Sequence, residues 1–579
     1  MLPATLNSGI HMVYLPQGRP RHRPDIPRDL RPKPEGLTFR DDALLYLASF
    51  GALLLAAIVF FFGMDVYNQD ALSRTVDAHN VLYSRDPHLG AIGLVWPPVP
   101  TMLRIAILPL TSAVNLTEFT GPLTSVIASA GCVVLLNHIL HRFGVPPITR
   151  GLWIGLTFAN PVLLFHFVNG TAESMFTFFF LWAVQSALQM RAAPERAVLG
   201  LGLSIGLALW VRYEALALMG MSVIGFLLMA WAYRREGAWS NISRFESLLV
   251  TLVFPSVFLL GLWLSFNYTA EGDALFFYRG PYSINAAPDV AKNAVDHALR
   301  YAYHSPLGSV GYVLQRTLQI SFLFPLAAAT VAILGIRMRR LEGTLLALLA
   351  VSTLLMQTYQ TYTGTIAPWL RYWVYLPILT IVLLGWIGQA YPYWLRKSTI
   401  AQVVRAGAIP AMILLANVLS YQTMGHTEVG ADEQLIVAVL AGDEERISDL
   451  RSNYPDRAVL ADVQDVLEAT EGTILVDLQK AHPLITGFDE TDRLIINTDR
   501  DFNATLDDPP QYANYVLLPD PRGKGVELQR DAIYTRFANL YDGAAWLEIV
   551  QEFEGEYLDW RLYRVLGAET PVAGASRDR

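Results

Sequence analysis

Long apolar segments recur along the chain, and each is close to the length of about 20 residues that a helix needs to cross the hydrocarbon layer of a bilayer. Polar or charged segments separate them. This pattern predicts a mainly α-helical polytopic membrane protein. We expect eleven spanning helices, at residues 43–63, 120–141, 150–168, 172–190, 197–213, 214–233, 247–267, 315–336, 343–360, 370–389 and 400–421.

The composition agrees with a membrane protein and excludes some chemistry. Of the 579 residues, 53% are hydrophobic and only 16% are charged, which is too apolar for a soluble globular protein. Cys132 is the single cysteine, so an intramolecular disulfide and a thiolate zinc site are both excluded.

The basic residues predict the orientation. Of the 29 Lys and Arg residues before residue 422, 20 lie in the segments that are cytoplasmic if the N-terminus is inside. Seven of them lie in a Pro/Arg-rich tail, residues 1–42. We therefore expect an integral plasma (inner) membrane protein with its N-terminus inside and its C-terminus outside, and a transmembrane domain at 43–421.

The C-terminal part differs sharply in charge. Residues 422–579 hold 14 Lys and Arg against 31 Asp and Glu, so this part carries −17 while the remainder carries +9. Short apolar runs such as TILVDL, RLIINTD and NYVLLPD alternate with polar helical stretches. This predicts an acidic, extracytoplasmic α/β domain, and its charge argues against nucleic-acid binding.

Several ionisable residues gather on the outer side in this topology. The outer loops at 64–119 and 268–314 lie there, together with the ends of helices that carry the polar residues Glu173, Arg212, Tyr213, Glu214 and Arg371. Ionisable groups at membrane depth are costly and usually face a cavity or a partner. We therefore expect one polar site at the outer face.

Asp70 lies in the first outer loop, where residues 70–82 can form an interfacial amphipathic helix that begins near Asn68 or Asp70. Two interpretations are open. Asp70 could cap this surface helix and be neutralised by Arg74. Alternatively, a carboxylate in a partly dry pocket could act as a general base that accepts a proton from a hydroxyl group.

The order of these features resembles a known class of enzymes. Asp70 follows the first span, an amphipathic helix comes next, and Trp96–Pro97–Pro98 precede another apolar helix. This resembles the GT-C class of membrane glycosyltransferases, which includes the protein O-mannosyltransferases and the bacterial aminoarabinose transferases. The resemblance covers roughly residues 43–421 and implies a GT-C-like fold.

The resemblance also implies a reaction. A sugar would pass from a polyprenyl-phosphate donor to an acceptor hydroxyl, on a lipid, glycan or protein, with inversion at the anomeric carbon. Asp70 would be the general base, and Asp65 is the reserve candidate. In the GT-C class an acidic residue recurs at the start of the corresponding helix, and Glu173 matches it here. Glu173 could therefore bind a sugar hydroxyl. Its other interpretation is a first-turn acid in a helix capped by Thr171.

A lipid phosphate requires cations, and arginine offers a fixed set of donors for it. The candidates are Arg212, Arg279 and Arg371, and each has another interpretation. Arg212 could form an ion pair with Glu173 or Glu214, and Arg279 could be solvated in a long loop. Arg371 could snorkel to the membrane interface. The aromatic candidates for the substrate site are Tyr213, Tyr282 and Trp96, and an interfacial aromatic belt is the alternative for such residues.

Metal dependence and transport stay open. Hard divalent cations prefer carboxylates, so Asp70, Asp86 and Glu173 could hold one, although their spacing does not establish a site. Membrane lipids are expected partners. The alternative function is a polytopic transporter or flippase of a lipid-linked sugar, for which eleven spans and a polar cavity would also serve.

Overall fold

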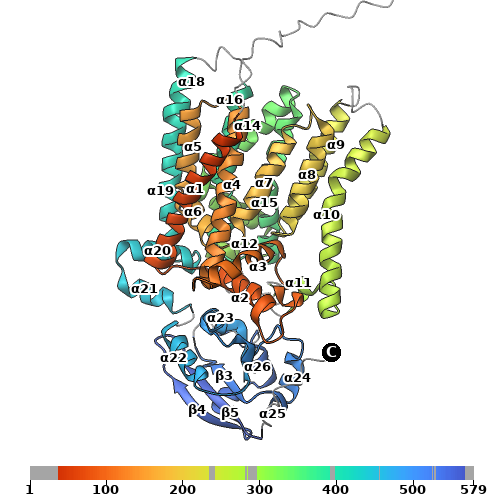
Figure 1. Cartoon of the computed structure of the whole chain (residues 1–579). Coiled ribbons are helices and arrows are strands. Elements are labelled where there is room, and N and C mark those ends of the chain that lie inside the picture. The colour runs from red at the N-terminus through yellow and green to blue at the C-terminus, as the bar shows by residue number, and fades with distance from the viewer. Residues whose placement is uncertain are drawn as a thin grey trace, which may run out of the picture. The chain divides into compact units, whose positions relative to one another are not determined.

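The computed structural model describes residues 37–233, 242–280, 283, 297–390, 398–454, 457–523, 526, 528 and 530–567. Residues 1–36 of the predicted tail lie outside the described residues, and so do Tyr282 and residues 284–296 of the predicted loop 268–314. Figure 1 shows long helices that run alongside one another and a small sheet built from strands near the C-terminus.

Among the described residues, seven helices are long and apolar enough to cross a membrane. Four of them are extended by short π- or 3-10-helical turns, η2 (Val59–Gly63), η4 (Thr117–Phe119), η7 (Leu370–Trp373) and η8 (Val404–Ala408). The seven helices are α1 (Phe39–Ile58), α4 (Thr120–Arg142), α9 (Ala215–Tyr233), α10 (Ile242–Glu271), α15 (Leu341–Thr363), α16 (Leu376–Ala390) and α19 (Ile409–Met424).

Two further apolar stretches are bent. The helices α5 (Pro147–Phe158) and α6 (Pro161–Val168) meet at 76°, and α13 (Pro306–Ser321) and α14 (Phe324–Arg337) meet at 101°. A proline lies in the first turn of α6 and of α14, where a missing N–H costs nothing and the previous helix has ended. The windows predicted at 150–168 and 315–336 are therefore each built from two helices, because the chain turns at residues 159–160 and 322–323.

The remaining predicted spans, 172–190 and 197–213, correspond to α7 (Glu173–Ala187) and α8 (Pro194–Leu209), which have 15 and 16 residues. Each predicted window thus coincides with a helix or a bent pair. These apolar helices make the protein an integral membrane protein. The number of membrane crossings and their orientation stay predictions.

Short elements connect α1 to α4. The amphipathic helix predicted at 70–82 is α2 (Gln69–Tyr83), and Asn68 caps it by accepting a hydrogen bond from the Ala71 N–H at 3.1 Å. The connection continues through η3 (Leu89–Ile92), α3 (Val99–Ser112) and η4 (Thr117–Phe119). Other short helices are α11 (Phe276–Arg279), α12 (His297–Ala302) and α18 (Thr399–Val403).

The chain after α19 combines helices with a five-stranded sheet of order β2-β1-β3-β5-β4. The first three strands are parallel and the last two are antiparallel to their neighbours. The strands are β1 (Ile474–Leu475), β2 (Leu494–Ile495), β3 (Tyr515–Pro519), β4 (Leu547–Phe553) and β5 (Trp560–Val565). The helices are α20 (Ala431–Ala441), α21 (Glu444–Arg451), α22 (Arg457–Glu468), α23 (Leu478–Gly487), α24 (Phe502–Asp507), α25 (Pro509–Tyr512) and α26 (Ala532–Arg536).

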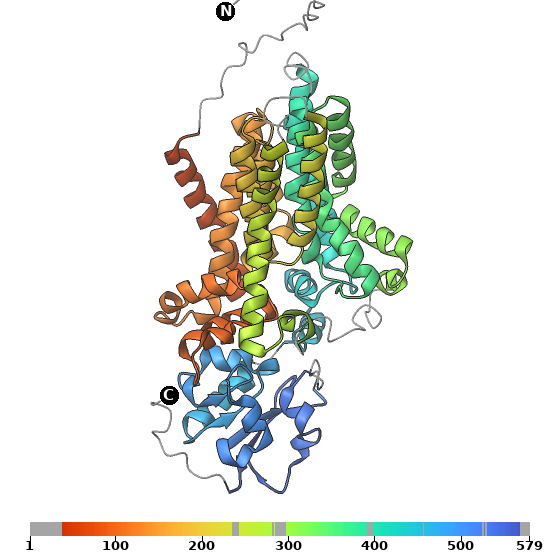
Figure 2. The same cartoon turned by 90° about the vertical axis from the view of Figure 1, so that its right-hand side faces the viewer.

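We call residues 457–567 the sheet region, and α2 packs against it. Val76 of α2 is fully buried in the same apolar cluster as Leu484 of α23 and Trp560 of β5. At the end of α2, Arg85 pairs with Asp499 at 3.0 Å. Figure 2 shows the orange-red segment that contains α2 beside the blue sheet region. The segment that carries Asp70 is therefore held between the apolar helices and the sheet region.

Candidate active site

Asp70 lies in the first turn of α2 and pairs with a distant arginine. Its Oδ2 is 2.7 Å from Nη1 of Arg371, and 36% of the Asp70 side chain is exposed. The interpretation of Asp70 as a helix cap neutralised by Arg74 is wrong, because Asn68 supplies the cap and Arg371 is the ion-pair partner. Asp70 thus has one side fixed by a guanidinium and part of its surface open.

Arg371 lies in η7 and connects two carboxylates. Its guanidinium carbon is 4.0 Å from the ring centre of Trp369, and its Nε is 3.9 Å from Oε1 of Glu173. Only 12% of the side chain is exposed. Arg371 is therefore held by an aromatic face and by Asp70 and Glu173, which differs from a side chain that snorkels alone to the interface.

Glu173 begins α7 and is almost completely buried, with 1% of the residue exposed. Its Oε1 accepts a hydrogen bond from Nη1 of Arg212, which also donates to Glu214 through Nε at 3.1 Å. The predicted cap by Thr171 is wrong, because the Thr171 hydroxyl donates to the His166 carbonyl at 3.0 Å. The start of α7 favours a negative charge, and the arginines compensate its burial.

These residues form what we call the charged cluster: Asp70, Glu173, Arg212, Glu214 and Arg371. They come from α2, from α7, from the turn between α8 and α9, and from η7, so segments far apart in the sequence meet here. Within the described residues, the second oxygen of Glu173 and the hydroxyl of Tyr375 are buried without a hydrogen-bond partner. The cluster therefore retains capacity to bind polar groups.

The Trp-Pro-Pro segment packs beside α2. The guanidinium carbon of Arg74 is 4.7 Å from the ring centre of Trp96, and its Nη1 donates to the Pro97 carbonyl at 3.3 Å. Tyr213 donates to the Val95 carbonyl at 3.2 Å. Trp96 and Tyr213 thus fix the geometry of this segment beside α2, and binding of substrate by them stays a prediction.

Three further candidates form their ion pairs away from the charged cluster in the part of the chain that the structure describes. Asp65 pairs with Arg457 at 3.4 Å and Asp86 pairs with Arg500. Arg279 pairs with Asp273 at 3.7 Å, and 64% of its side chain is exposed, which fits a solvated loop residue. Tyr282 lies outside the described residues.

The candidate metal ligands Asp70, Asp86 and Glu173 each lie beside an arginine. The described ranges contain no group of three or more His, Cys, Asp or Glu side chains placed to hold an ion. Asp70 and Glu173 are occupied by arginines, and Asp86 is tied to the sheet region through Arg500. A divalent cation at Asp70, Asp86 and Glu173 stays a prediction from the sequence.

Sequence reasoning missed several residues that hold this site. Arg104 of α3 is buried and its Nη1 donates to the Ala71 carbonyl at 2.6 Å, which supports the first turn of α2. At the start of α20, Asp432 accepts a hydrogen bond from Asn68, near Asp70, and Glu433 accepts one from the Leu370 N–H, next to Arg371. The available signal was an acidic pair just after the last apolar helix, and its partners were not visible in the sequence.

The sheet region also approaches Asp70. Burial, reinforced by the positive charge of Lys480, lowers the pKa of His482 to about 4, and the charge of Asp70 opposes this shift. His482 lies in α23, the helix that contacts α2. The sheet region therefore contributes to the electrostatic surroundings of the charged cluster.

Asp77, two turns after Asp70, has no role in the cluster. It is 8% exposed, and burial raises its pKa to about 8, while Arg74 and Arg104 oppose the shift. Gly93 has φ +82 and lies directly against the Asp77 carboxylate. Asp77 therefore supports the packing of η3 on α2, and burial favours its uncharged form.

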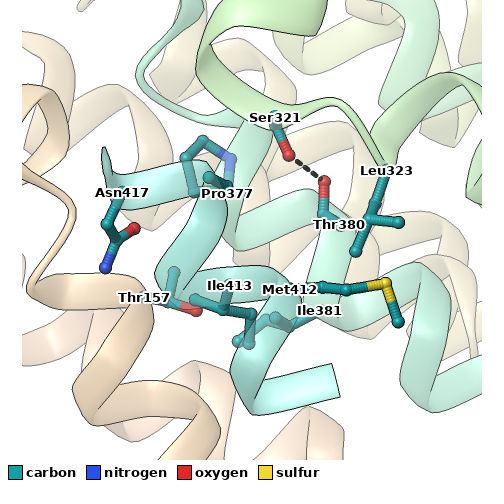
Figure 3. Close-up of a pocket in the computed structure, with 10 residues that line it drawn as sticks. Thr157, Ser321, Leu323, Pro377, Thr380, Ile381, Met412, Ile413 and Asn417 are labelled. Atoms are coloured by element: carbon teal, nitrogen blue, oxygen red, sulfur yellow. Dashed lines mark hydrogen bonds between the residues drawn. The ribbon is translucent and has the colours of Figure 1, made fainter. Parts of the chain in front are cut away.

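A small cavity lies elsewhere, among the apolar helices. Its volume is about 20 Å³, room for about one water molecule. In its lining, the hydroxyls of Ser321 and Thr380 are hydrogen bonded at 2.7 Å (Figure 3). Thr157 and Asn417 add polar atoms to the lining. None of its lining residues belongs to the charged cluster, so we do not assign the substrate to it.

Comparison with known proteins identifies the fold. No protein-family model matches the sequence, and no curated protein matches it. The crystal structure of ArnT from Cupriavidus metallidurans bound to undecaprenyl phosphate has 11% sequence identity and a TM-score of 0.52 over 91% of this chain and 98% of that chain. Its apo state has the same identity and TM-score over 90% and 98%.

The apo oligosaccharyltransferase of Archaeoglobus fulgidus has 12% identity and a TM-score of 0.39 over 84% of this chain and 71% of that chain. The similarity to ArnT extends over the apolar helices and the sheet region alike, since it covers nearly the full length of both chains. The GT-C resemblance seen in the sequence is therefore confirmed, and the chain has the fold of the GT-C glycosyltransferase ArnT.

Proposed function

We propose that this protein is a glycosyltransferase that moves a sugar from a polyprenyl-phosphate donor to an acceptor hydroxyl at the outer membrane face. The observation that carries the proposal is the ion pair between the partly exposed Asp70 and Arg371, in a buried charged cluster. The ArnT fold supports it, since that protein was crystallised with undecaprenyl phosphate. The transmembrane part, 43–421, would bind the lipid donor.

Asp70 is the proposed general base. The acceptor hydroxyl donates its proton to the Asp70 carboxylate while its oxygen attacks the anomeric carbon of the sugar. The bond from that carbon to the phosphate oxygen breaks, and polyprenyl phosphate leaves with the bonding electrons. Attack opposite the leaving group inverts the anomeric centre. Asp65, which pairs with arginines of α21 and the sheet region, is the weaker candidate.

Charge balance gives Arg371 a second role. The carboxylates of Asp70, Glu173 and Glu214 interact with three guanidiniums, those of Arg212, Arg371 and Arg74. When Asp70 takes up the proton, Arg371 loses the closer of its two anionic partners at the moment when the leaving phosphate gains charge. A guanidinium so released can stabilise that phosphate.

The acceptor would reach Asp70 beside the acidic sheet region. Lys480 and His482 of α23 provide polar groups on that side. Acceptor binding is the role that we propose for residues 422–579, outside the membrane. The predicted orientation, with residues 1–42 inside, places the site and this domain on the same outer side.

The test is the rate of sugar transfer from a radiolabelled polyprenyl-phosphate sugar by purified Asp70→Asn protein. We expect a decrease of at least about a hundredfold, the usual size for loss of a general base. The matched control is Asp462→Asn, an exposed residue of α22, which should transfer at the rate of the unmodified protein. Unchanged transfer by Asp70→Asn would reject its role as base.

A transporter or flippase predicts a different outcome. Purified protein in vesicles would then move the labelled lipid across the bilayer and form no glycosidic product. That result would reject the transferase proposal as a whole.

A further inference from the structure

Two adjacent carboxylates open α20, the first helix after the last apolar helix. Glu433 is 1% exposed and Asp432 is partly buried. Burial, together with the negative charge of Glu433, raises the pKa of Asp432 to about 6. Neither residue pairs with Lys or Arg in the described part of the chain, so their hydrogen-bond partners decide what they do.

Asp432 holds the start of α2. Its Oδ2 accepts a hydrogen bond from Nδ2 of Asn68 at 2.5 Å, and its other oxygen accepts one from the Tyr454 hydroxyl. Asn68 is the cap of α2, with its own oxygen on the Ala71 N–H at 3.1 Å. Asp432 therefore fixes the capping side chain of the helix turn that carries Asp70.

Glu433 holds the start of η7. Its Oε1 accepts hydrogen bonds from the Leu370 backbone N–H and from Nε2 of His166, both at 3.1 Å. Leu370 directly precedes Arg371, so this contact sets the position of the arginine backbone. A buried carboxylate with two donors is a rigid point in the structure.

Gly430 permits this close approach. A Cβ atom at this position would overlap the second oxygen of Glu433 and would lie 2.6 Å from Cδ1 of Trp369. Trp369 is the aromatic ring beneath the Arg371 guanidinium. The backbone at the start of α20 therefore lies directly against the platform on which Arg371 rests.

We propose that Asp432 and Glu433 are positioning residues that set the separation between Asp70 and Arg371. One carboxylate fixes the segment of Asp70 and its neighbour fixes the segment of Arg371, and both belong to the same helix turn. The inference rests on the proposed function only where it predicts a loss of kcat for sugar transfer. The geometric part concerns the two segments themselves and can be measured without any substrate.

The experiment uses the full-length protein in detergent and compares Asp432→Ala and Glu433→Ala with the unmodified chain. Hydrogen exchange measures the Ala71 N–H for the first variant and the Leu370 N–H for the second. We expect at least about tenfold faster exchange at the amide on the affected side, and slow exchange at the other. Sugar transfer should fall at least about tenfold in kcat, because small displacements of reacting groups are costly.

Conservative variants separate positioning from general stability. Asp432→Asn and Glu433→Gln keep an oxygen acceptor and should restore slow exchange and most of kcat; they also serve if the alanine variants fail to fold. Asp443→Ala is the matched control, since it removes the cap of the neighbouring helix α21. It should lower the melting temperature while leaving kcat and both amides unchanged.

The outcomes are distinct. Unchanged exchange in both alanine variants overturns the inference, and so does faster exchange with full kcat. If Asp443→Ala lost as much kcat as Asp432→Ala and Glu433→Ala, the loss would be an effect of general stability. That result would also overturn the inference. If the unmodified protein transfers no sugar, the proposed function fails, whereas the exchange measurements still decide whether α20 positions the two segments.

Discussion

Arg371 forms an ion pair with Asp70 at 2.7 Å, although the two residues belong to segments from opposite ends of the apolar part of the chain. The same guanidinium directs a different nitrogen, Nε, toward Glu173 at 3.9 Å. A planar guanidinium can serve two carboxylates at once, whereas the ammonium of lysine is a single point charge. These two contacts predict that position 371 requires arginine and that lysine cannot replace it.

Arg371→Lys is expected to reduce kcat/KM for transfer at least about tenfold, because a single ammonium cannot hold its position against Asp70 and Glu173 at once. The measurement is the initial rate with the labelled donor. Arg279→Lys is the control, since Arg279 is exposed and pairs only weakly with Asp273 at 3.7 Å. Equal rates for both variants would contradict the bridging role of Arg371.

Glu173→Gln is expected to lower the free energy of unfolding by about 3 kcal/mol, since it leaves two carboxylates, Asp70 and Glu214, to compensate the buried guanidiniums that three carboxylates compensated before. Thermal and denaturant unfolding in detergent would measure the loss. Combining the change with Arg212→Met removes both charges of the closest pair and should recover at least about 1 kcal/mol. A double variant that is as unstable as the sum of the single changes would show that the pair does not act as a unit.

Asp77→Asn is expected to change how stability depends on pH. Burial raises the pKa of Asp77 to about 8 from its ordinary value of about 3.8, so the folded protein binds this proton more tightly than the unfolded chain. The contribution of Asp77 to stability is therefore greatest at low pH and falls as the pH rises from about 4 to about 8. Asparagine stays neutral, so the variant should gain in melting temperature relative to the unmodified protein between pH 6 and pH 9. Parallel melting curves across this range would contradict the shifted pKa.

Gly93→Ala is expected to destabilise the protein more than Gly144→Ala. Both glycines have positive φ, +82 and +73, which costs a side chain about 1 kcal/mol. A Cβ at Gly93 would also overlap the Asp77 carboxylate, while nothing lies within 4 Å of one at Gly144. The difference in unfolding free energy between the two variants, expected at about 1–3 kcal/mol, isolates the overlap. Equal losses would show that Asp77 moves away without cost.

Local features were predictable because they depend on neighbouring residues. The apolar windows marked the helices, the start of α2 was predicted near Asn68 or Asp70, and the runs TILVDL, RLIINTD and NYVLLPD each contain a strand. Periodicity, capping and turn chemistry act over a few residues, so a single sequence displays them. The break at residues 322–323 was missed because the apolar pattern continues across it.

The partners of the ionisable residues were not predictable in this way. The sequence placed Arg212, Arg279 and Arg371 equally as outer-face cations, yet the structure brings two of them to Glu173 and leaves Arg279 at the surface.

The sequence by itself determined a polytopic membrane protein with an acidic C-terminal part, a resemblance to the GT-C class and a short set of candidate residues. Only the tertiary structure decided that Asp70 meets Arg371 and that Asp432 and Glu433 hold the segments on which they lie. The reason is physical. Contacts between segments far apart in sequence depend on how helices pack and where they bend, and neither residue type nor spacing along the chain encodes that geometry directly.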